Sequence, residues 1–238
     1  MLSAADEAFA VRLQAHDEAA WRDRLLREVI ADFGAYEVRS KGDAFMIAAS
    51  DATSALNLCF EAQRRLLECP WPGAIMEQPS GAKVVGEDGE LLFRGLRVRM
   101  GIHIGRPRCK PDPMTGRMDY VGGMVNRAAR VADAAHGGQI LLSEAVYQAL
   151  DEGFDAELYD LGVHRLRGLR REEHLRQAVP AAQAGRRFPP VLTFGLRHAA
   201  VPAAYHDFFG RDDELTQVRR KLHLDASAVV VLASGGMG

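Results

Sequence analysis

The sequence predicts a mixed β-sheet with helices packed on it. Residues 96–104 alternate apolar and polar side chains, which is the period of a strand with two different faces. Residues 51–67 repeat apolar side chains at helical spacing, and turn residues separate further segments of both kinds. Strands that alternate with helices along a chain indicate a sheet covered by helices.

The first half of the chain divides at glycine and proline residues. Gly34 ends a first helix, Gly42-Asp43 marks a hairpin turn, and Pro70 stops a second helix. The elements expected up to residue 104 are helices over about 5–33 and 51–67, strands over 36–40, 45–49 and 96–104, and an irregular excursion over 73–95.

The second half begins with an arm and continues with shorter elements. Residues 106–118 hold three prolines and one glycine, which predicts an arm or loop. The elements expected next are helices over 124–135 and 144–150 and strands over 139–142, 159–166 and 173–178. Composition then divides the chain into a domain over 1–180, a proline-containing linker over 181–206 and a further segment over 207–238 with a short strand over 229–232.

Composition and charge exclude several classes of protein. With 47% hydrophobic and 26% charged residues, the chain has the composition of a soluble globular protein. Its net charge of -2 gives no nucleic-acid or membrane signature, and no apolar run approaches the length of a membrane span. Three scattered cysteines have no metal or redox spacing, which indicates a reducing compartment. We therefore expect a cytoplasmic protein with neither a nucleic-acid nor a membrane partner.

Two segments carry residues suited to phosphate chemistry. Asn126 and Arg130 are four residues apart and share one helix face, where an amide and a fixed cation suit polyphosphate oxygens. Asp43 lies in a Gly-Asp turn, where an aspartate is usually structural, because it bonds its own backbone. An exposed carboxylate at a strand end can also bind Mg²⁺ beside a triphosphate.

Three motifs together identify a family. Arg39-Ser-Lys-Gly-Asp-Ala-Phe-Met46, Val98-Arg-Met-Gly-Ile-His-Ile-Gly105 and Asp112-Pro-Met-Thr-Gly-Arg-Met-Asp-Tyr-Val-Gly-Gly-Met-Val-Asn-Arg-Ala-Ala-Arg130 resemble the class III nucleotidyl cyclase catalytic domain. The Asp-Pro-x-Thr arm is most similar to the version in fungal-type adenylyl cyclases and their bacterial relatives. The resemblance covers about residues 5–180 and implies an α+β fold with a ferredoxin-like antiparallel sheet.

The resemblance also implies an activity and residue roles. Such domains convert ATP to 3′,5′-cyclic AMP and pyrophosphate for intracellular signalling, as head-to-tail homodimers with Mg²⁺ or Mn²⁺. By that resemblance Asp43 binds metal, Asp119 accepts from the adenine amino group, Asn126 orients the ribose and Arg130 stabilises phosphoryl charge. Arg167 matches a basic residue near the phosphates, although a solvated surface arginine is an equal interpretation.

Two departures from the family pattern stand out. Arg39 occupies a base-reading position that is a lysine in most adenylyl cyclases, and a planar guanidinium is not an ammonium. The family also begins with a strand that ends in Phe-Thr-Asp and lies between the strands at 45–49 and 96–104; this sequence shows no such strand. Its absence removes the first metal aspartate and leaves two strand edges unpaired. We therefore expect this chain to be weakly active or inactive.

The segment 207–238 resembles the start of another domain. Phe208-Phe-Gly-Arg-Asp-Asp-Glu-Leu215 resembles the entry to STAND-type or AAA-like ATPase domains, and residues 229–238 resemble the strand and first half of a P-loop. The alternative interpretation is a glycine-rich tail after an apolar strand. The main alternative to an adenylate cyclase is thus an inactive regulatory or dimerisation module that controls a downstream NTPase. Asp119 disfavours guanylate cyclase activity.

Overall fold

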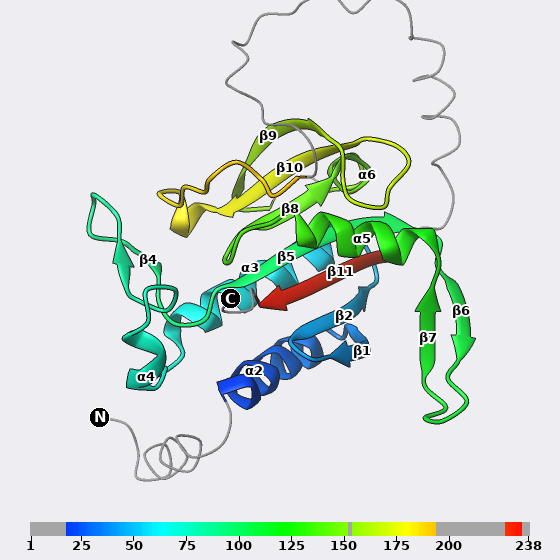
Figure 1. Ribbon diagram of the computed structural model, residues 1–238, viewed down its shortest axis with the longest axis horizontal. Coiled ribbons are helices and arrows are strands. Elements are labelled where there is room, and N and C mark those ends of the chain that lie inside the picture. The colour runs from blue at the N-terminus through cyan, green and yellow to red at the C-terminus, as the bar shows by residue number, and fades with distance from the viewer. Residues whose placement is uncertain (1–17, 152–153, 194–226, 235–238) are drawn as a thin grey trace, which may run out of the picture.

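One seven-stranded sheet with helices on both faces organises the protein (Figure 1). The computed structural model describes residues 18–151, 154–193 and 227–234. The strand order is β1-β2-β11-β5-β8-β10-β9, and every neighbouring pair is antiparallel except β5 and β8. The strands of this sheet are β1 (Tyr36–Lys41), β2 (Ala44–Ala49), β5 (Val98–Gly105), β8 (Ile140–Ser143), β9 (Ala156–His164), β10 (Glu173–Pro180) and β11 (Ser227–Ser234).

Alternating side chains of the central strands meet helices on opposite faces. Phe45 and Ile47 of β2 belong to the larger core, which contains the apolar sides of α2 and α3. Met46 of β2 points the other way and packs with the buried face of α5. The helices are α2 (Glu18–Asp32), α3 (Ala52–Glu68), α4 (Gly73–Met76), α5 (Gly123–Asp133), α6 (Glu144–Tyr147) and the 3-10 turn η1 (Ala181–Gln183).

The arm and the excursion are more regular than the sequence predicts. Residues 106–118, expected as a loop, contribute to a two-stranded ribbon of β6 (Arg108–Pro111) and β7 (Met118–Val121). Asp112 closes the ribbon, because its Oδ1 accepts bonds from Met114 N and Thr115 N at 2.8 and 2.9 Å. Proline is tolerated here because an isolated ribbon has two edge strands. The excursion at 73–95 holds α4 and a second ribbon, β3 (Val84–Val85) and β4 (Leu91–Phe93).

The centre of the sheet is filled from the distal end of the chain. Strand β11 lies between β2 and β5 and runs antiparallel to both, pairing Val230 with Ile47 on one side and Ile102 on the other. The edges of β2 and β5 that we expected to be unpaired are therefore paired with β11. A strand over 229–232 was expected, but in a separate ATPase domain. Residues 194–226 and 235–238 lie outside the described residues, so that domain stays a prediction.

The packed unit continues beyond residue 180. Arg186 is 2% exposed and donates to Leu92 O, Gln63 Oε1 and Gly138 O at 2.9, 3.1 and 3.3 Å. Leu192 N donates to Ala134 O at 2.8 Å. The described part of the expected linker, 181–193, is thus bound to the domain, and it brings Leu192 and Thr193 to the end of α5.

Candidate active site

Helix α5 carries two of the predicted residues and lies unusually close to the sheet. Its N-cap, Gly122, has φ 118°, a conformation that side chains rarely adopt. A Cβ on Gly101 of β5 would come within 2.2 Å of Ala132 N, so only glycine allows this approach. Arg127 Nε lies 3.3 Å from Glu173 Oε2 on β10, and burial raises the pKa of Glu173. These contacts fix the exposed side of α5, where Asn126 lies.

Arg130, one turn after Asn126, lines a cleft that also collects Arg99 and Arg167. The cleft has a volume of about 410 Å³; its other lining residues are Asp133, Ala134, Leu166, Leu192 and Thr193. Arg130 Nη1 donates to Asp133 Oδ2 at 2.7 Å, and Arg99 Nη2 lies 4.0 Å from Asp133 Oδ1. Three guanidinium groups with one carboxylate make the cleft suited to a polyanion.

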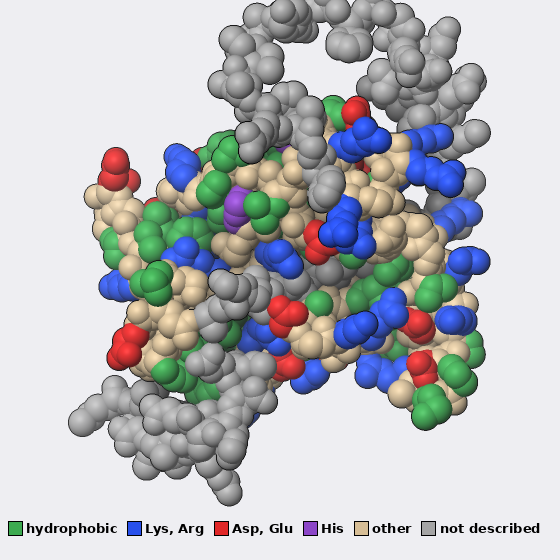
Figure 2. All heavy atoms as spheres, viewed as in Figure 1, with side chains coloured by type: hydrophobic (Ala, Val, Ile, Leu, Met, Phe, Trp, Pro, Cys, Tyr) green, Lys and Arg blue, Asp and Glu red, His purple; other side chains and the backbone are tan. Residues whose placement is uncertain are grey.

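Two buried donors in this cleft lack partners. The Nε atoms of Arg99 and Arg130 have no hydrogen-bond partner among the described residues. A buried, unpaired donor is costly, so both guanidinium groups keep hydrogen-bonding capacity that an anionic ligand could use. Figure 2 shows Lys and Arg side chains gathered in the half of this face where α5 and the arm lie. The local charge is therefore positive despite the net charge of -2.

Sequence reasoning did not single out Arg99. A usable signal was present, because Arg99 alternates with the buried Met100 and shares a strand face with Gly101, against which α5 packs. A cation on that face, two residues from a glycine beneath a helix, has to lie near the helix end. Arg167, by contrast, was predicted near the phosphates, and it does line the cleft with Arg130.

The two predicted base-reading residues lie together. Arg39 of β1 and Asp119 of β7 are 80 residues apart in sequence, and Arg39 Nη1 lies 3.9 Å from Asp119 Oδ1. That oxygen is buried and has no hydrogen-bond partner among the described residues. The arrangement offers a planar donor group beside an acceptor that still needs a donor.

Asp43 lies exposed at the tip of the β1–β2 hairpin, where Gly42 has φ 59°. It is at the same end of the sheet as Arg99, because Ala233 of β11 pairs with Ala44 on one side and Arg99 on the other. Two strand spacings separate those backbones, about 10 Å. The sequence of β11 ends in Leu232-Ala-Ser234, so it brings no carboxylate to this end.

The described residues do not complete a divalent-metal site. Nowhere within them do three or more His, Cys, Asp or Glu side chains cluster as metal ligands would. Hard cations such as Mg²⁺ require several oxygen ligands, and the predicted ligand Asp43 would supply one. The donor set therefore does not fit the two-ion site that the family resemblance implied.

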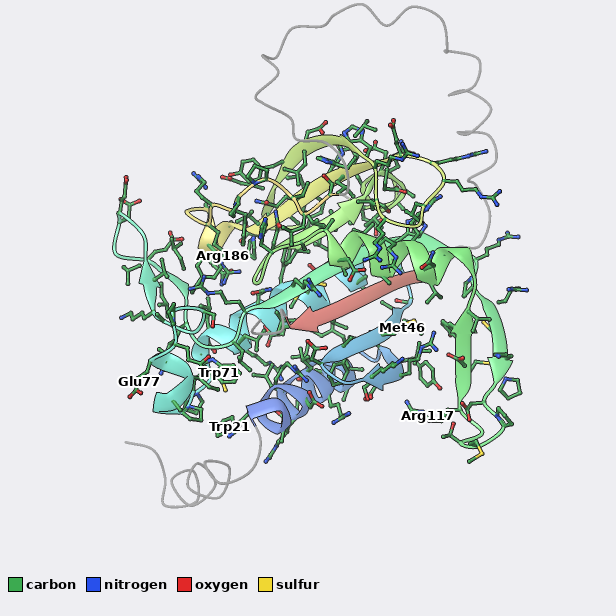
Figure 3. All side chains as sticks on the ribbon, viewed as in Figure 1. Trp21, Met46, Trp71, Glu77, Arg117 and Arg186 are labelled. Carbon is green, nitrogen blue, oxygen red and sulfur yellow. The ribbon has the colours of Figure 1, made fainter. Side chains whose placement is uncertain are left out.

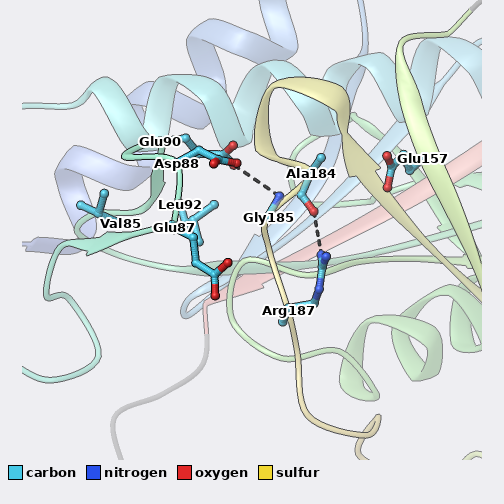
Figure 4. A pocket seen from close by; sticks show the side chains of 10 residues that line it. Val85, Glu87, Asp88, Glu90, Leu92, Glu157, Ala184, Gly185 and Arg187 are labelled. Atoms are coloured by element: carbon cyan, nitrogen blue, oxygen red, sulfur yellow. Dashed lines mark hydrogen bonds between the residues drawn. The ribbon is translucent and has the colours of Figure 1, made fainter.

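Two other features can be assigned no part in this chemistry. His103 is buried with Nδ1 2.8 Å from Ser143 Oγ, and burial, followed by the nearby charge of Arg127, lowers its pKa to about 3. A second hollow of about 540 Å³ lies between the β3–β4 ribbon and residues 184–187, away from the predicted site residues (Figure 4). Its walls carry four carboxylates, which would repel a triphosphate; they belong to Glu87, Asp88, Glu90 and Glu157.

Comparisons with known proteins agree with this geometry. The sequence profile described as "Adenylate and Guanylate cyclase catalytic domain" matches residues 22–176. The chain belongs to this family. An adenylate cyclase of Podospora anserina is 35% identical over 212 residues, which is 76% of this chain and 10% of that protein. An adenylate cyclase of Mycosarcoma maydis is 52% identical over 126 residues, 53% of this chain and 5% of that protein.

Solved structures show the same fold. An adenylate cyclase from Trypanosoma brucei in its monomeric state superposes with a TM-score of 0.67 at 28% identity, covering 80% of this chain and 89% of that one. The cyclase CyaB from P. aeruginosa superposes with a TM-score of 0.52 at 20% identity, covering 71% and 88%. The predicted α+β cyclase fold is thus confirmed. The chain spans a tenth or less of the length of the two curated relatives named above. Among the described residues, none of the helices is long and apolar enough to cross a membrane.

Proposed function

We propose that this domain binds ATP and converts it to 3′,5′-cyclic AMP and pyrophosphate. The observation that carries the proposal is the buried, unsatisfied Oδ1 of Asp119 beside Arg39. Adenine presents an amino donor next to a ring-nitrogen acceptor. A carboxylate can accept from the first while a guanidinium donates to the second. The pair fits adenine rather than guanine. Guanine has an acceptor where adenine has its amino donor, and a donor where adenine has its ring-nitrogen acceptor.

The arginine cleft supports binding of the triphosphate. In the proposed reaction the ribose 3′-oxygen bonds to the α-phosphorus, and the bond from that phosphorus to the bridging oxygen breaks. Pyrophosphate leaves, and the 3′-hydroxyl proton is released. Arg130 would stabilise charge on the transferring phosphoryl group, Asn126 would orient the ribose, and Arg99 and Arg167 would hold phosphate oxygens.

The proposed active form is a homodimer in which Asp43 of one subunit meets Asn126 and Arg130 of the other. Asp43 would be one ligand of Mg²⁺ or Mn²⁺, but a single carboxylate does not make the site, so no step is assigned to a metal. We place the protein in the cytoplasm, in keeping with its three free cysteines. An ATPase domain beginning near residue 207 remains part of the proposal.

An inactive regulatory module is the second candidate. The observation that favours it is the single carboxylate at the metal end of the sheet. Such a module would bind nucleotide through Arg39 and Asp119 and transmit its occupancy to a downstream NTPase. Turnover separates the two functions, whereas nucleotide preference is common to both.

The test measures ATP and GTP binding to the purified chain in the presence of Mg²⁺, together with formation of cyclic AMP. We expect ATP to bind more tightly than GTP. Asp119→Ala should reduce ATP affinity about tenfold, since a hydrogen bond to a charged group is lost. Arg130→Ala should reduce cyclic AMP formation at least a hundredfold. Arg64→Ala is the matched control, because Arg64 makes surface ion pairs with Glu61 and Glu68 on α3 and does not line the cleft.

Mixing variants tests the composite site. Asp43→Ala and Arg130→Ala should each lower activity, and their mixture should recover part of it, because one heterodimer site keeps both residues. Equal affinity for GTP and ATP would contradict the base assignment. ATP binding without turnover in every mixture would favour the regulatory module.

A further inference from the structure

The arm formed by β6 and β7 is fastened to the edge strand β1 around one tyrosine. Tyr36 Oη donates to Met118 O at 3.1 Å. The guanidinium carbon of Arg117 lies 5.5 Å from the centroid of the Tyr36 ring, and Arg117 Nη2 donates to Glu37 O. The rings of Tyr36 and Tyr120 are 6.2 Å apart between centroids. We call these contacts the seam between β1 and β7.

The seam lies next to the predicted base-reading pair. Asp119 lies on β7 between Met118 and Tyr120, both of which contact Tyr36, and Arg39 follows Tyr36 by three residues on β1. Arg117 is labelled in Figure 3, where it lies beside the lower part of the ribbon and faces the β1 side. The pair and the seam therefore join the same two strands over the same few residues.

The arm depends on this seam for its placement. A two-stranded ribbon is marginal by itself, and Figure 1 shows β6 and β7 projecting beyond the edge of the main sheet. Met114 at its tip is 91% exposed, so the tip has little packing. Position matters because an acceptor displaced by 1 Å from its donor loses most of its directional hydrogen bond.

We propose that Tyr36 and Arg117 are positioning residues that set the preference for adenine over guanine by fixing Asp119 against Arg39. This rests on the proposed adenine site. Neither residue touches the nucleotide in this proposal. Tyr36 holds the β7 backbone one residue before Asp119, and Arg117 covers the Tyr36 ring while it binds the β1 backbone at Glu37.

The decisive variant is Tyr36→Phe, which keeps the ring and removes only the hydroxyl. We expect ATP affinity to fall roughly five- to tenfold, the effect of one hydrogen bond. GTP affinity should stay within twofold, so the ATP-to-GTP ratio should fall by the same factor. Arg117→Met should lower the ratio further when combined with Tyr36→Phe. Competition against a fluorescent adenine nucleotide measures both affinities without requiring turnover.

The matched control is Tyr159→Phe. Tyr159 lies on β9, the opposite edge strand, where its hydroxyl bonds Glu157. It should leave both affinities unchanged. A merely structural role for Tyr36 predicts equal losses for ATP and GTP together with a lower melting temperature, and that result would overturn the proposal. So would an unchanged ratio in a wild-type background that prefers ATP.

The wild-type measurement separates this proposal from the one on which it rests. If the unaltered chain binds neither nucleotide, or prefers GTP, the adenine site itself is wrong and the positioning role falls with it. If the wild type prefers ATP and Tyr36→Phe preserves that preference, only the positioning role is wrong.

Discussion

At the start of β1, Tyr36 and Arg39 are paired with an arm that supplies Asp119, whereas at its end Asp43 stands exposed at a hairpin tip. The seam between β1 and β7 and the predicted base-reading pair are both formed within one chain. The two residues of that pair, Arg39 and Asp119, are 80 positions apart in sequence. Among the described residues, the predicted metal end has the carboxylate of Asp43, and β11 beside it ends in Leu232-Ala-Ser234. The predicted base-reading residues are thus brought together within this chain, whereas the described residues bring one carboxylate, that of Asp43, to the predicted metal end.

The largest effect on stability is expected from disrupting β11, the strand that pairs with β2 next to the hairpin of Asp43. Val230→Pro removes a backbone donor and introduces a ring into a strand that is paired on both sides. We expect the free energy of unfolding to fall by about 3 kcal/mol or more. Urea unfolding monitored by circular dichroism measures it.

The control for that variant is Glu87→Pro. Glu87 is the first central residue of a turn closed by Gly89 N to Gly86 O at 3.1 Å, a position that accepts proline. Its effect on stability should be within about 0.5 kcal/mol. If Val230→Pro is equally mild, β11 does not complete the sheet. In that case β11 is also not the strand that lies beside Asp43.

Placement of β11 also shows where sequence reasoning stops. The local patterns found the helix of Asn126 and Arg130 and the strand that contains Arg99, because each pattern repeats within one element. Neither pattern specifies which strands become neighbours. An apolar strand at 227–234 pairs equally well in a separate domain or in the gap between β2 and β5, so its observed position required the structure.

The candidate site divides in the same way. Arg39 and Asp119 were predicted through separate motifs of the resemblance, and the structure brings them within 3.9 Å. Arg99 was missed because its role depends on the approach of α5 over Gly101, a long-range contact. The arm was expected as a loop since proline disfavours strands, but an isolated ribbon tolerates Pro111 at an edge. The seam around Tyr36 could not be foreseen from either segment alone.

A second prediction asks whether the metal end can be completed. Ala233 of β11 pairs with Ala44, so residue 234 is one step further along β11 and Asp43 is one step further along the hairpin. Ser234→Asp should therefore raise the affinity for Mn²⁺ on the order of tenfold, because a second carboxylate joins the first. Electron paramagnetic resonance of free Mn²⁺ during a titration measures the affinity.

Ser227→Asp is the matched control, since it adds the same charge at the other end of the same strand, opposite Gly105. It should leave Mn²⁺ affinity unchanged. Equal gains from the two variants would mean that added charge, not its place beside Asp43, attracts the ion. The asymmetry between the two ends of β1 would then have another origin.

The smallest effect concerns β5, the strand that contributes Arg99 to the cleft and His103 to the core. Burial lowers the pKa of His103 to about 3, whereas in the unfolded chain the pKa is near 6.5. The unfolded state therefore binds a proton first as pH falls, and the stability present above pH 6.5 is lost progressively towards pH 3. Between pH 7 and 5.5 this group should cost roughly 1 kcal/mol of unfolding free energy.

His103→Gln keeps a polar group that can bond Ser143 Oγ and does not titrate, so the stability of this variant should depend less on pH across that interval. Parallel urea titrations at the two pH values measure the difference. The same pH dependence in both proteins would show that a group other than His103 is responsible for the loss of stability.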